Sequence, residues 1–534
     1  MGIISKVHPV RSHSNAAQGG INAALNVDDS WESHAYDTVK GSDYLGDQDA
    51  IEIMCREAPG EVLWLEHQGV TFHRNEKGEL GTRAFGGASV ARTYYVADIT
   101  GQAIMHTLYE QLMKHADLID RYEEWFTTDL AMDESGHCIG AITRNIRDGS
   151  IELFEAKSVI LATGGNGQIW QPTTNALICT GDGIAMAYRA GATLMDMEMI
   201  QYHPTTLAGK GFLITEGARG EGAHLLNAKG ERFMERYAPN KMELASRDVV
   251  SRAEQTEINE GRGFPDGTVA LDVTVVPRKR IHEALREIVL VGRDFAGVDI
   301  TREPIHIKPG NHYTMGGIKT DVWGRSDIPG LYAAGEVACV SVHGGNRLGA
   351  NSLLDTLIFG RRSGEDAAKH AQGRGFDRVP RSALADEEAR VNAIMGRERG
   401  SGRRVSEIKA ELGATMDGKV AVFRDEEGIT EALETVKRLK EEATSAYIDD
   451  RGTIFNQDVL GALELENMLD QAEATCMAAL ERKESRGAQF RTDYPERNDE
   501  EWLKHIDVTL KGDTPEISYS PVTITDWQPQ ERTY

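Results

Sequence analysis

Two short stretches decide the fold: AKSVILATGG at residues 156–165 and PGLYAAGE at residues 329–336. Each is an apolar run that ends in glycine, which is typical of a buried parallel strand that leads into a tight turn. Such turns are where α/β sheets place cofactors, because glycine lets the backbone approach a ligand closely. We therefore predict two halves of one nucleotide-binding domain, separated by an insertion at roughly 203–308 that caps the ligand.

The last third of the chain has a different pattern of apolar and charged residues. Apolar residues recur at spacings of three and four, a pattern that predicts amphipathic helices with charged outer faces. After residue 487 the chain turns to short charged and β-prone pieces such as ISYSPVTIT, which predict a small terminal β element. The helices, expected to form a bundle that serves for structure or docking, are predicted at 386–396, 403–415, 427–447 and 457–483.

Composition narrows the functional classes. The chain has 534 residues, with 59 basic and 84 acidic side chains and a formal net charge of −25. A surface with this much negative charge repels phosphates and anionic lipid headgroups. We therefore do not expect nucleic acid as a direct partner. No run of about 18 apolar residues and no signal peptide are present, which predicts a soluble protein on the cytoplasmic side.

The five cysteines are far apart and form no C-x-x-C motif, which excludes a cysteine-ligated zinc or iron–sulfur motif within this chain. They give no disulfide framework, as expected for a reducing compartment. They are Cys55, Cys138, Cys179, Cys339 and Cys476.

The N-terminal stretch RSHSNAAQGG at residues 11–20 is small and loop-like. Gly19 and Gly20 would let it lie flat against a planar ring system, and we expect a helix to start from Ile21 to Leu25. Taken on this segment alone, His13 is more often a surface-loop histidine than a functional one.

This stretch, together with TVKGSDYLGDQDAI at 38–51, resembles the flavoprotein subunits of succinate dehydrogenase and fumarate reductase. The resemblance runs in order from residue 5 to about residue 500, nearly the whole chain. Its further motifs are ATGGNGQIW, TTNALICTGDG, QYHPT, TEGARGEG, GERFMERYAP, SRDVVSR, HYTMGG, YAAGEVACVSVHGGNRLGANSLLD and SRGAQFRTDYPERND.

The resemblance implies a covalently bound FAD. In that family the histidine of the S-H-S/T stretch is attached to the flavin 8-methyl group, which assigns the attachment to His13. The related L-aspartate oxidases have a similar A-Q-G-G loop without this histidine. The remaining cofactor contacts implied are Ser5, Lys6, Gln18, Gly19, Gly164, Gly165, Asp182, Glu336, Ser352 and Leu353.

The resemblance also implies a site for a C4 dicarboxylate. Cationic and hydrogen-bonding groups are needed at both ends of such a substrate, and His203, Thr215, His312 and Arg347 match the family's carboxylate-binding residues, with Phe85 as a packing neighbour. Arg247 matches the proton shuttle, with Glu216 and Arg219 as its relay. Considered one at a time, each of these residues is more often structural; Arg247, for example, could pair with Asp248 or with a glutamate of the capping domain.

The sequence departs from the family's pattern in two places. The family opens with a strand and G-x-G-x-x-G, whereas GIISK at residues 2–6 resembles its second strand and no G-x-G-x-x-G occurs. We therefore expect an N-terminal truncation in which about 35 residues, with the first strand and the pyrophosphate-binding helix N-terminus, are absent. The other departure is Gln489, where the family more often has histidine; we expect a tolerated change near the surface.

Together these features predict a flavoprotein catalytic subunit that interconverts succinate and fumarate by hydride transfer. An iron–sulfur subunit would receive the electrons for a quinone, and a membrane anchor would hold the complex peripherally at the cytoplasmic face of the cell membrane. The alternatives are an L-aspartate oxidase-like flavoenzyme and an FAD-free remnant. The α/β fold is expected to comprise an FAD-binding Rossmann-like domain at 1–202 and 309–375, incomplete at its N-terminus, an α+β capping domain at 203–308, a helical domain at 380–488 and a C-terminal domain at 489–534.

Overall fold

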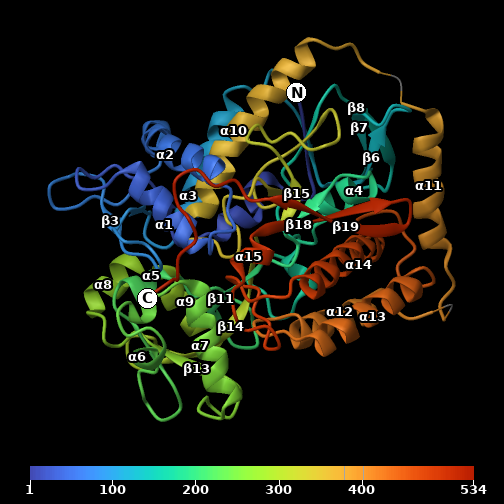
Figure 1. Cartoon of the computed structure of the whole chain (residues 1–534). Helices are drawn as coiled ribbons and strands as arrows, with labels where there is room; N and C mark the ends of the chain where they lie inside the picture. Colours follow the sequence, from blue (N-terminus) through green and yellow to red (C-terminus); the bar gives the residue numbers. More distant parts are fainter. Residues whose placement is uncertain (378, 401, 534) are drawn as a thin grey trace.

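The structure, a computed structural model, describes residues 1–377, 379–400 and 402–533. In Figure 1 the first part of the chain, in blue to cyan, lies on both sides of the long helix α10 (Asn351–Gln372). A green segment projects at the lower left, and the orange and red helices lie at the lower right. The chain thus separates into regions that meet near the middle of the molecule.

The two stretches with glycine turns form neighbouring strands, as the sequence predicts. Strand β9 (Val159–Leu161) pairs in parallel with β16 (Leu331–Ala333), and Ile160 lies opposite Tyr332. Parallel pairing brings the carboxyl ends of both strands to one edge, so the two turns lie together there. A second parallel pair, β1 (Gly2–Ser5) with β5 (Asp120–Glu123), forms a separate two-stranded sheet.

Helices and small antiparallel sheets surround these strands. Helix α1 begins after Ser30, whose side chain accepts from the Ser33 N–H as an N-cap, and α2 ends at Gly69 in the left-handed conformation. The elements of this region are α1 (Trp31–Gly41), α2 (Gln48–Gln68), α3 (Thr100–Met113), α4 (Asp182–Arg189), the sheet β2 (Ile21–Asn22), β4 (Thr93–Tyr94), β3 (Thr82–Arg83) and the sheet β6 (Trp125–Met132), β7 (Cys138–Asn145), β8 (Ile151–Glu155).

The prediction that a helix starts between Ile21 and Leu25 is wrong. Residues Ile21 and Asn22 are strand β2, which pairs with β4. The Asn22 side chain also donates to the Gly349 carbonyl at 2.8 Å. These long-range bonds decide the conformation over the local helical preference.

The insertion forms a sheet of its own, in the order β11-β14-β13-β12. Strand β11 (Ile200–Leu207) is buried along its whole length and pairs with β14 (Ile305–Thr314), so the start and end of the insertion are joined. The other elements are β12 (His224–Leu226), β13 (Val269–Asp272), α5 (Gly217–Gly220), α6 (Met234–Tyr237), α7 (Arg247–Asn259), α8 (Arg278–Ala284) and α9 (Arg286–Val291).

The predicted amphipathic helices are present. Helices α12 and α13 pack against the long buried α14, around residues such as Leu412, Val436 and Leu469. The helices are α11 (Arg381–Gly396), α12 (Val405–Lys419), α13 (Glu426–Ala443), α14 (Gln457–Glu481) and the short α15 (Asp499–Trp502).

The terminal β element is a hairpin that joins a larger sheet. Strands β18 (Lys504–Lys511) and β19 (Thr514–Pro521) pair over eight residues each. The hairpin extends β10 (Leu194–Met195), β15 (Gly317–Lys319) and β17 (Ala338–Cys339), so the C-terminus completes a sheet begun far earlier in the chain.

Gln489 does not lie near the surface as expected. Its side chain is fully buried, donates to the Ala479 carbonyl at 3.0 Å and accepts from Arg424. The residue therefore bonds to two buried polar groups, one near the end of α14 and one just before α13.

The C-terminal tail links the N-terminal region to the insertion. It crosses α1 and ends beside the green helices in Figure 1. Arg532 pairs with Asp43 at 2.8 Å, just after α1, and with Asp248 at 2.7 Å, on α7. Asp248 is the residue next to Arg247, so this tail fixes the start of α7.

Candidate active site

A cavity of about 820 Å³ lies between the strand-end turns and the inserted sheet. Fourteen of the predicted site residues line it: His13, Gln18, Gly19, Phe85, Gly164, His203, Thr215, Glu216, Arg247, His312, Glu336, Arg347, Ser352 and Leu353. The fold thus brings residues from both halves of the predicted nucleotide-binding domain and from the insertion to one place.

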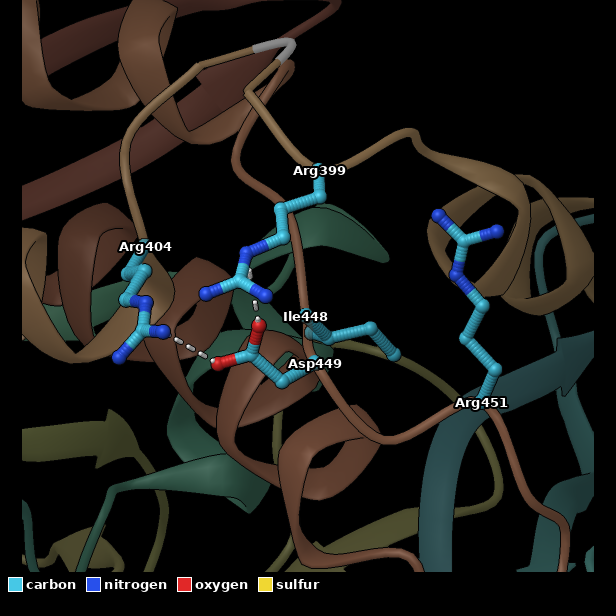
Figure 2. Close-up of a pocket in the computed structure, with 5 residues that line it drawn as sticks. All are labelled: Arg399, Arg404, Ile448, Asp449 and Arg451. Atoms are coloured by element: carbon cyan, nitrogen blue, oxygen red, sulfur yellow. Dashed lines mark ion pairs between the residues drawn. The ribbon is translucent and has the colours of Figure 1, made fainter.

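A second hollow, of about 440 Å³, lies beside the segment between α11 and α12 and contains none of these residues. Figure 2 shows Arg399 and Arg404 turned toward Asp449, at 3.7 and 2.9 Å, with Arg451 to one side. These side chains are largely exposed, so the charges here are screened by solvent. Of these two hollows, only the larger one is lined by predicted site residues.

The strand-end turns build one wall of the cavity. Gly164 has φ 75°, and a side chain there would enter open space. At Gly165 a Cβ would approach the Glu336 carboxyl to 2.4 Å, so its glycine makes room for that carboxyl rather than for a ligand. Burial raises the pKa of Glu336 to about 7, and its Oε1 accepts from the Thr314 N–H at 3.0 Å.

The cavity is lined by buried polar atoms that a ligand could satisfy. Among the described residues, the buried polar atoms Asn15 Oδ1, Gln18 Oε1 and Asn175 Oδ1 have no hydrogen-bond partner, and all three residues line the cavity. Buried polar groups are rarely left unpaired, so unpaired acceptors gathered at one cavity indicate a ligand with several donors.

His13 lies on a short 3-10 turn, His13–Ala16, at the cavity. Its Nδ1 accepts from the Ala176 N–H at 3.3 Å. Burial lowers the pKa of His13 to about 4. The ring is therefore neutral at neutral pH, with its proton on Nε2.

Two further histidines lie together in the cavity. The rings of His203 and His312 are 4.8 Å apart between centroids. Burial and the charge of Arg247 hold the pKa of both well below the usual range. His203 Nδ1 accepts from the Thr205 N–H at 3.2 Å, which leaves its ring proton on Nε2 as a neutral donor.

Arg347 is positioned by an aromatic ring. Its guanidinium lies 4.2 Å from the centroid of the Tyr313 ring. Burial, followed by the charge of Arg247, lowers its pKa to about 10. Its Nε has no acceptor within the part of the chain that the structure describes, so this cation keeps unused hydrogen-bonding capacity.

Arg247 begins helix α7 and is joined to a relay of charged groups. Its Nε donates to Glu216 Oε2 at 2.7 Å, and Arg219 Nη2 lies 3.5 Å from the same oxygen. Burial alone would raise the pKa of Glu216, but the two arginines lower it, so the carboxylate is ionised. The guanidinium groups of Arg247, Arg219 and Arg347 thus lie near the single carboxylate of Glu216. The positive charges outnumber this negative charge, which suits the binding of a dianion.

Five predicted site residues do not line the cavity. Lys6 is instead paired with Asp182 at 3.0 Å and with Glu464 at 2.5 Å, so its charge is already neutralised. Ser5 Oγ donates to the Val7 carbonyl at 2.5 Å. Gly165 lies against Glu336, and Arg219 lies behind Glu216, as described above.

Some residues at the site were not singled out from the sequence. Gln201 Oε1 accepts from Arg247 Nη1 at 2.9 Å, and Thr174 Oγ1 lies 2.7 Å from His312 Nδ1. Both lie inside stretches already noted, QYHPT and TTNALICTGDG. Gln201 could have been predicted as a site residue because it is two residues before His203. Thr174 could not, because only the fold brings it to His312.

Comparison with protein families defines the class. The model described as "FAD binding domain" matches residues 2–353, and the model described as "Fumarate reductase flavoprotein C-term" matches residues 409–534. The chain is therefore an FAD-binding oxidoreductase of the flavoprotein class.

The family follows from full-length relatives. The chain is 46% identical to the succinate dehydrogenase flavoprotein subunit of Rickettsia conorii over 98% of this chain and 91% of that protein. It is 44% identical to the fumarate reductase flavoprotein subunit of Mycobacterium tuberculosis, over 100% and 94%. The FrdA chain of E. coli quinol fumarate reductase superposes with a TM-score of 0.95 at 37% identity, over 99% and 93%. The chain belongs to the family of succinate dehydrogenase and fumarate reductase flavoprotein subunits.

These matches correct one expectation. The FAD-binding model matches from residue 2, so the comparisons do not support the predicted absence of a first strand and a glycine-rich loop. The rest of the predicted family, fold class and enzyme class is confirmed.

Proposed function

We propose that this chain interconverts succinate and fumarate at the cavity, with His203, Thr215, His312 and Arg347 binding the two carboxylates. The observation that carries the proposal is the excess of buried guanidinium groups around Glu216, beside two neutral histidines. Such a site attracts a dianion and supplies neutral donors as well. Phe85, which lies against Gly19, would pack beside the bound substrate.

Arg247 is the proposed proton shuttle. The reaction moves a hydride and a proton, and bound FAD supplies the hydride chemistry. A free arginine holds its proton too tightly for this work. In the fold, Glu216 accepts a bond from Arg247 and is shared with Arg219, so a proton lost by Arg247 can be replaced along this relay. Gln201 fixes Nη1, which leaves Nη2 outside these two bonds.

The residues proposed to hold FAD are Gln18, Gly19, Gly164, Glu336, Ser352 and Leu353. His13 is the proposed site of covalent attachment, through Nε2, once the ring proton is released. In the variant His13→Ser the flavin should come free in acid. Denaturing gels viewed for flavin fluorescence would test this, and flavin that stays with the denatured variant would contradict the attachment.

Electrons must leave through partner chains. The described cysteines are buried and free, and we propose that an iron–sulfur subunit accepts the electrons. No helix among the described residues is long and apolar enough to span a membrane. We propose that a separate anchor holds this subunit peripherally at the cytoplasmic face of the membrane.

The experiment that tests the function compares Arg247→Ala with the unchanged protein. Succinate oxidation with a dye as acceptor should be abolished in the variant, while FAD stays bound, because only the proton transfer is removed. Appreciable residual turnover would remove Arg247 as the shuttle. Peroxide formation from L-aspartate in air, in place of succinate oxidation, would instead favour an oxidase, and a chain that binds no FAD would favour the remnant.

A further inference from the structure

Arg347 and Arg247 both lie at the cavity, but their side chains are held differently. Arg247 donates to Glu216 and to Gln201, as described above. The guanidinium of Arg347 has no hydrogen bond to another group in the part of the chain that the structure describes, and its buried Nε is left without an acceptor. Hydrogen bonds fix its backbone instead: the N–H donates to Met315 Sδ at 3.1 Å, and the carbonyl accepts from Gln201 Nε2 at 2.8 Å. A contact other than a hydrogen bond must therefore set the direction of this side chain.

The ring of Tyr313 makes that contact. The guanidinium of Arg347 lies 4.2 Å from the ring centroid, a distance at which a buried cation is attracted to the face of an aromatic ring. Tyr313 is 5% exposed and lies on β14 directly after His312. A ring holds a cation without occupying any of its N–H donors, whereas a carboxylate would occupy donors and neutralise the charge. The arginine thus keeps its charge and its donors for an anionic ligand.

The Tyr313 ring is itself held by a residue outside the cavity. Its hydroxyl oxygen lies 3.3 Å from His343 Nε2, and the two rings meet edge to face, with centroids 5.3 Å apart and planes at 81°. The same Nε2 lies 3.5 Å from the Asp355 carboxylate on α10. Neither His343 nor Asp355 is among the described residues that line the cavity. A line of buried contacts therefore runs from α10 through His343 and Tyr313 to Arg347.

We propose that Tyr313, held by His343, is a positioning residue that orients the guanidinium of Arg347 toward the substrate carboxylate. The inference rests on the proposed function of Arg347 in binding that carboxylate. Tyr313 acts through its ring, and His343 acts through the Tyr313 hydroxyl, so removal of the ring costs more than removal of the hydroxyl alone. Neither group gives or takes a proton in this scheme.

The test measures fumarate binding to the oxidised, FAD-loaded enzyme from the change in flavin absorbance, beside steady-state fumarate reduction with a reduced dye. Tyr313→Leu removes the ring, so the Kd for fumarate should rise roughly tenfold to thirtyfold. The value of kcat/KM should fall by at least the same factor, because a displaced guanidinium misplaces the substrate. Tyr313→Phe keeps the ring and should raise Kd by only about twofold to fivefold.

Double variants test each link of the line separately. His343→Leu should raise Kd as much as Tyr313→Phe does, and the two together should be no worse than either alone, since both remove the same contact. Tyr313→Leu added to Arg347→Met should cost no further affinity, because the ring acts only through that arginine. Further losses in either double variant would overturn the proposal.

Tyr494→Leu is the matched control, because Tyr494 also lies against a buried arginine. Its ring centroid is 5.1 Å from the guanidinium of Arg491, which donates to Asp493 at 2.8 Å and to the Ala479 carbonyl at 3.0 Å. Because these bonds hold the cation without the ring, Kd and kcat/KM should stay within about twofold of the unchanged enzyme.

Three results would contradict the role of Tyr313. One is an affinity of Tyr313→Leu within about twofold of the unchanged enzyme, and another is an equal loss in Tyr313→Phe and Tyr313→Leu. The third is a loss of affinity that follows Tm across all the variants, the Tyr494→Leu control included, since that would be a structural effect.

Arg347→Met measured alone keeps the two proposals apart. If Arg347→Met binds fumarate as tightly as the unchanged enzyme, the proposed function of Arg347 fails. If Arg347→Met loses fumarate binding while Tyr313→Leu retains it, only the positioning role of Tyr313 fails.

Discussion

Two regions of the molecule bury clusters of arginine, and they differ in how the charges are satisfied. At the cavity, Arg219 and Arg347 keep donors without acceptors among the described residues. Beyond the end of α14, Arg482, Arg486 and Arg491 are equally buried, yet each of their side-chain nitrogens has an acceptor. A buried cation with unused donors lacks a partner that the chain does not supply, whereas a fully bonded one belongs to the framework.

The bonds of Arg482 and Arg486 show this pairing in detail, whereas Arg424, which also lies in this region, has no partner for Nη2 among the described residues. Arg482 donates to Glu198 at 2.6 Å, to Glu484 at 3.1 Å and to two backbone carbonyls. Arg486 donates to the same Glu484 through Nε, at 2.7 Å, and to the Asp43 carbonyl at 2.9 Å. These bonds tie the end of α14 to the hairpin β18–β19 and to the N-terminal region.

Exchanging one arginine in each region for methionine should give the largest effects and opposite phenotypes. Arg482→Met leaves Glu198 and Glu484 buried without their partner, so the free energy of unfolding should fall by about 3–5 kcal/mol. Arg347→Met removes a cation with spare donors, so Tm should hold while kcat/KM for fumarate falls by roughly 10²–10⁴-fold. Thermal melting and steady-state kinetics on both variants check this. A stable Arg482→Met protein, or an unstable Arg347→Met protein, would remove the distinction.

The amount of structure that could be predicted from the sequence differs between these regions. The strand-end turns and most of the cavity residues could be predicted, because motifs such as QYHPT and HYTMGG keep the chemistry in short local patterns. The pairing of Lys6 could not be predicted, because its partners Asp182 and Glu464 lie far along the chain; its predicted contact with the cofactor stays a prediction. His343 gave no signal for a similar reason: it lies inside a stretch already noted, but only the fold brings it to Tyr313. Pairing of buried charges depends on tertiary contacts that spacing alone does not encode.

A smaller effect should distinguish the paired region by its dependence on pH. His505 on β18 lies 2.7 Å from Asp196 and 3.4 Å from Asp47. Burial alone would lower its pKa, but the two carboxylates raise it to about 10. The folded state therefore retains a proton that the unfolded state loses above pH ~6.5. This stabilisation is fully present below that pH and is lost as pH rises through about 10, at no more than about 1.4 kcal/mol per pH unit.

Urea unfolding of His505→Gln at pH 7 and pH 9 checks this, with the exposed His115→Gln as control. The unchanged protein and the control should both lose stability between these two values, while His505→Gln should lose clearly less. The histidines at the cavity have the opposite character, since burial and Arg247 keep His203 and His312 neutral in the same range. If the stability of His505→Gln falls as steeply between pH 7 and pH 9 as that of the unchanged protein, the pH dependence arises elsewhere. His505 would then not be the group in the paired region whose titration changes stability.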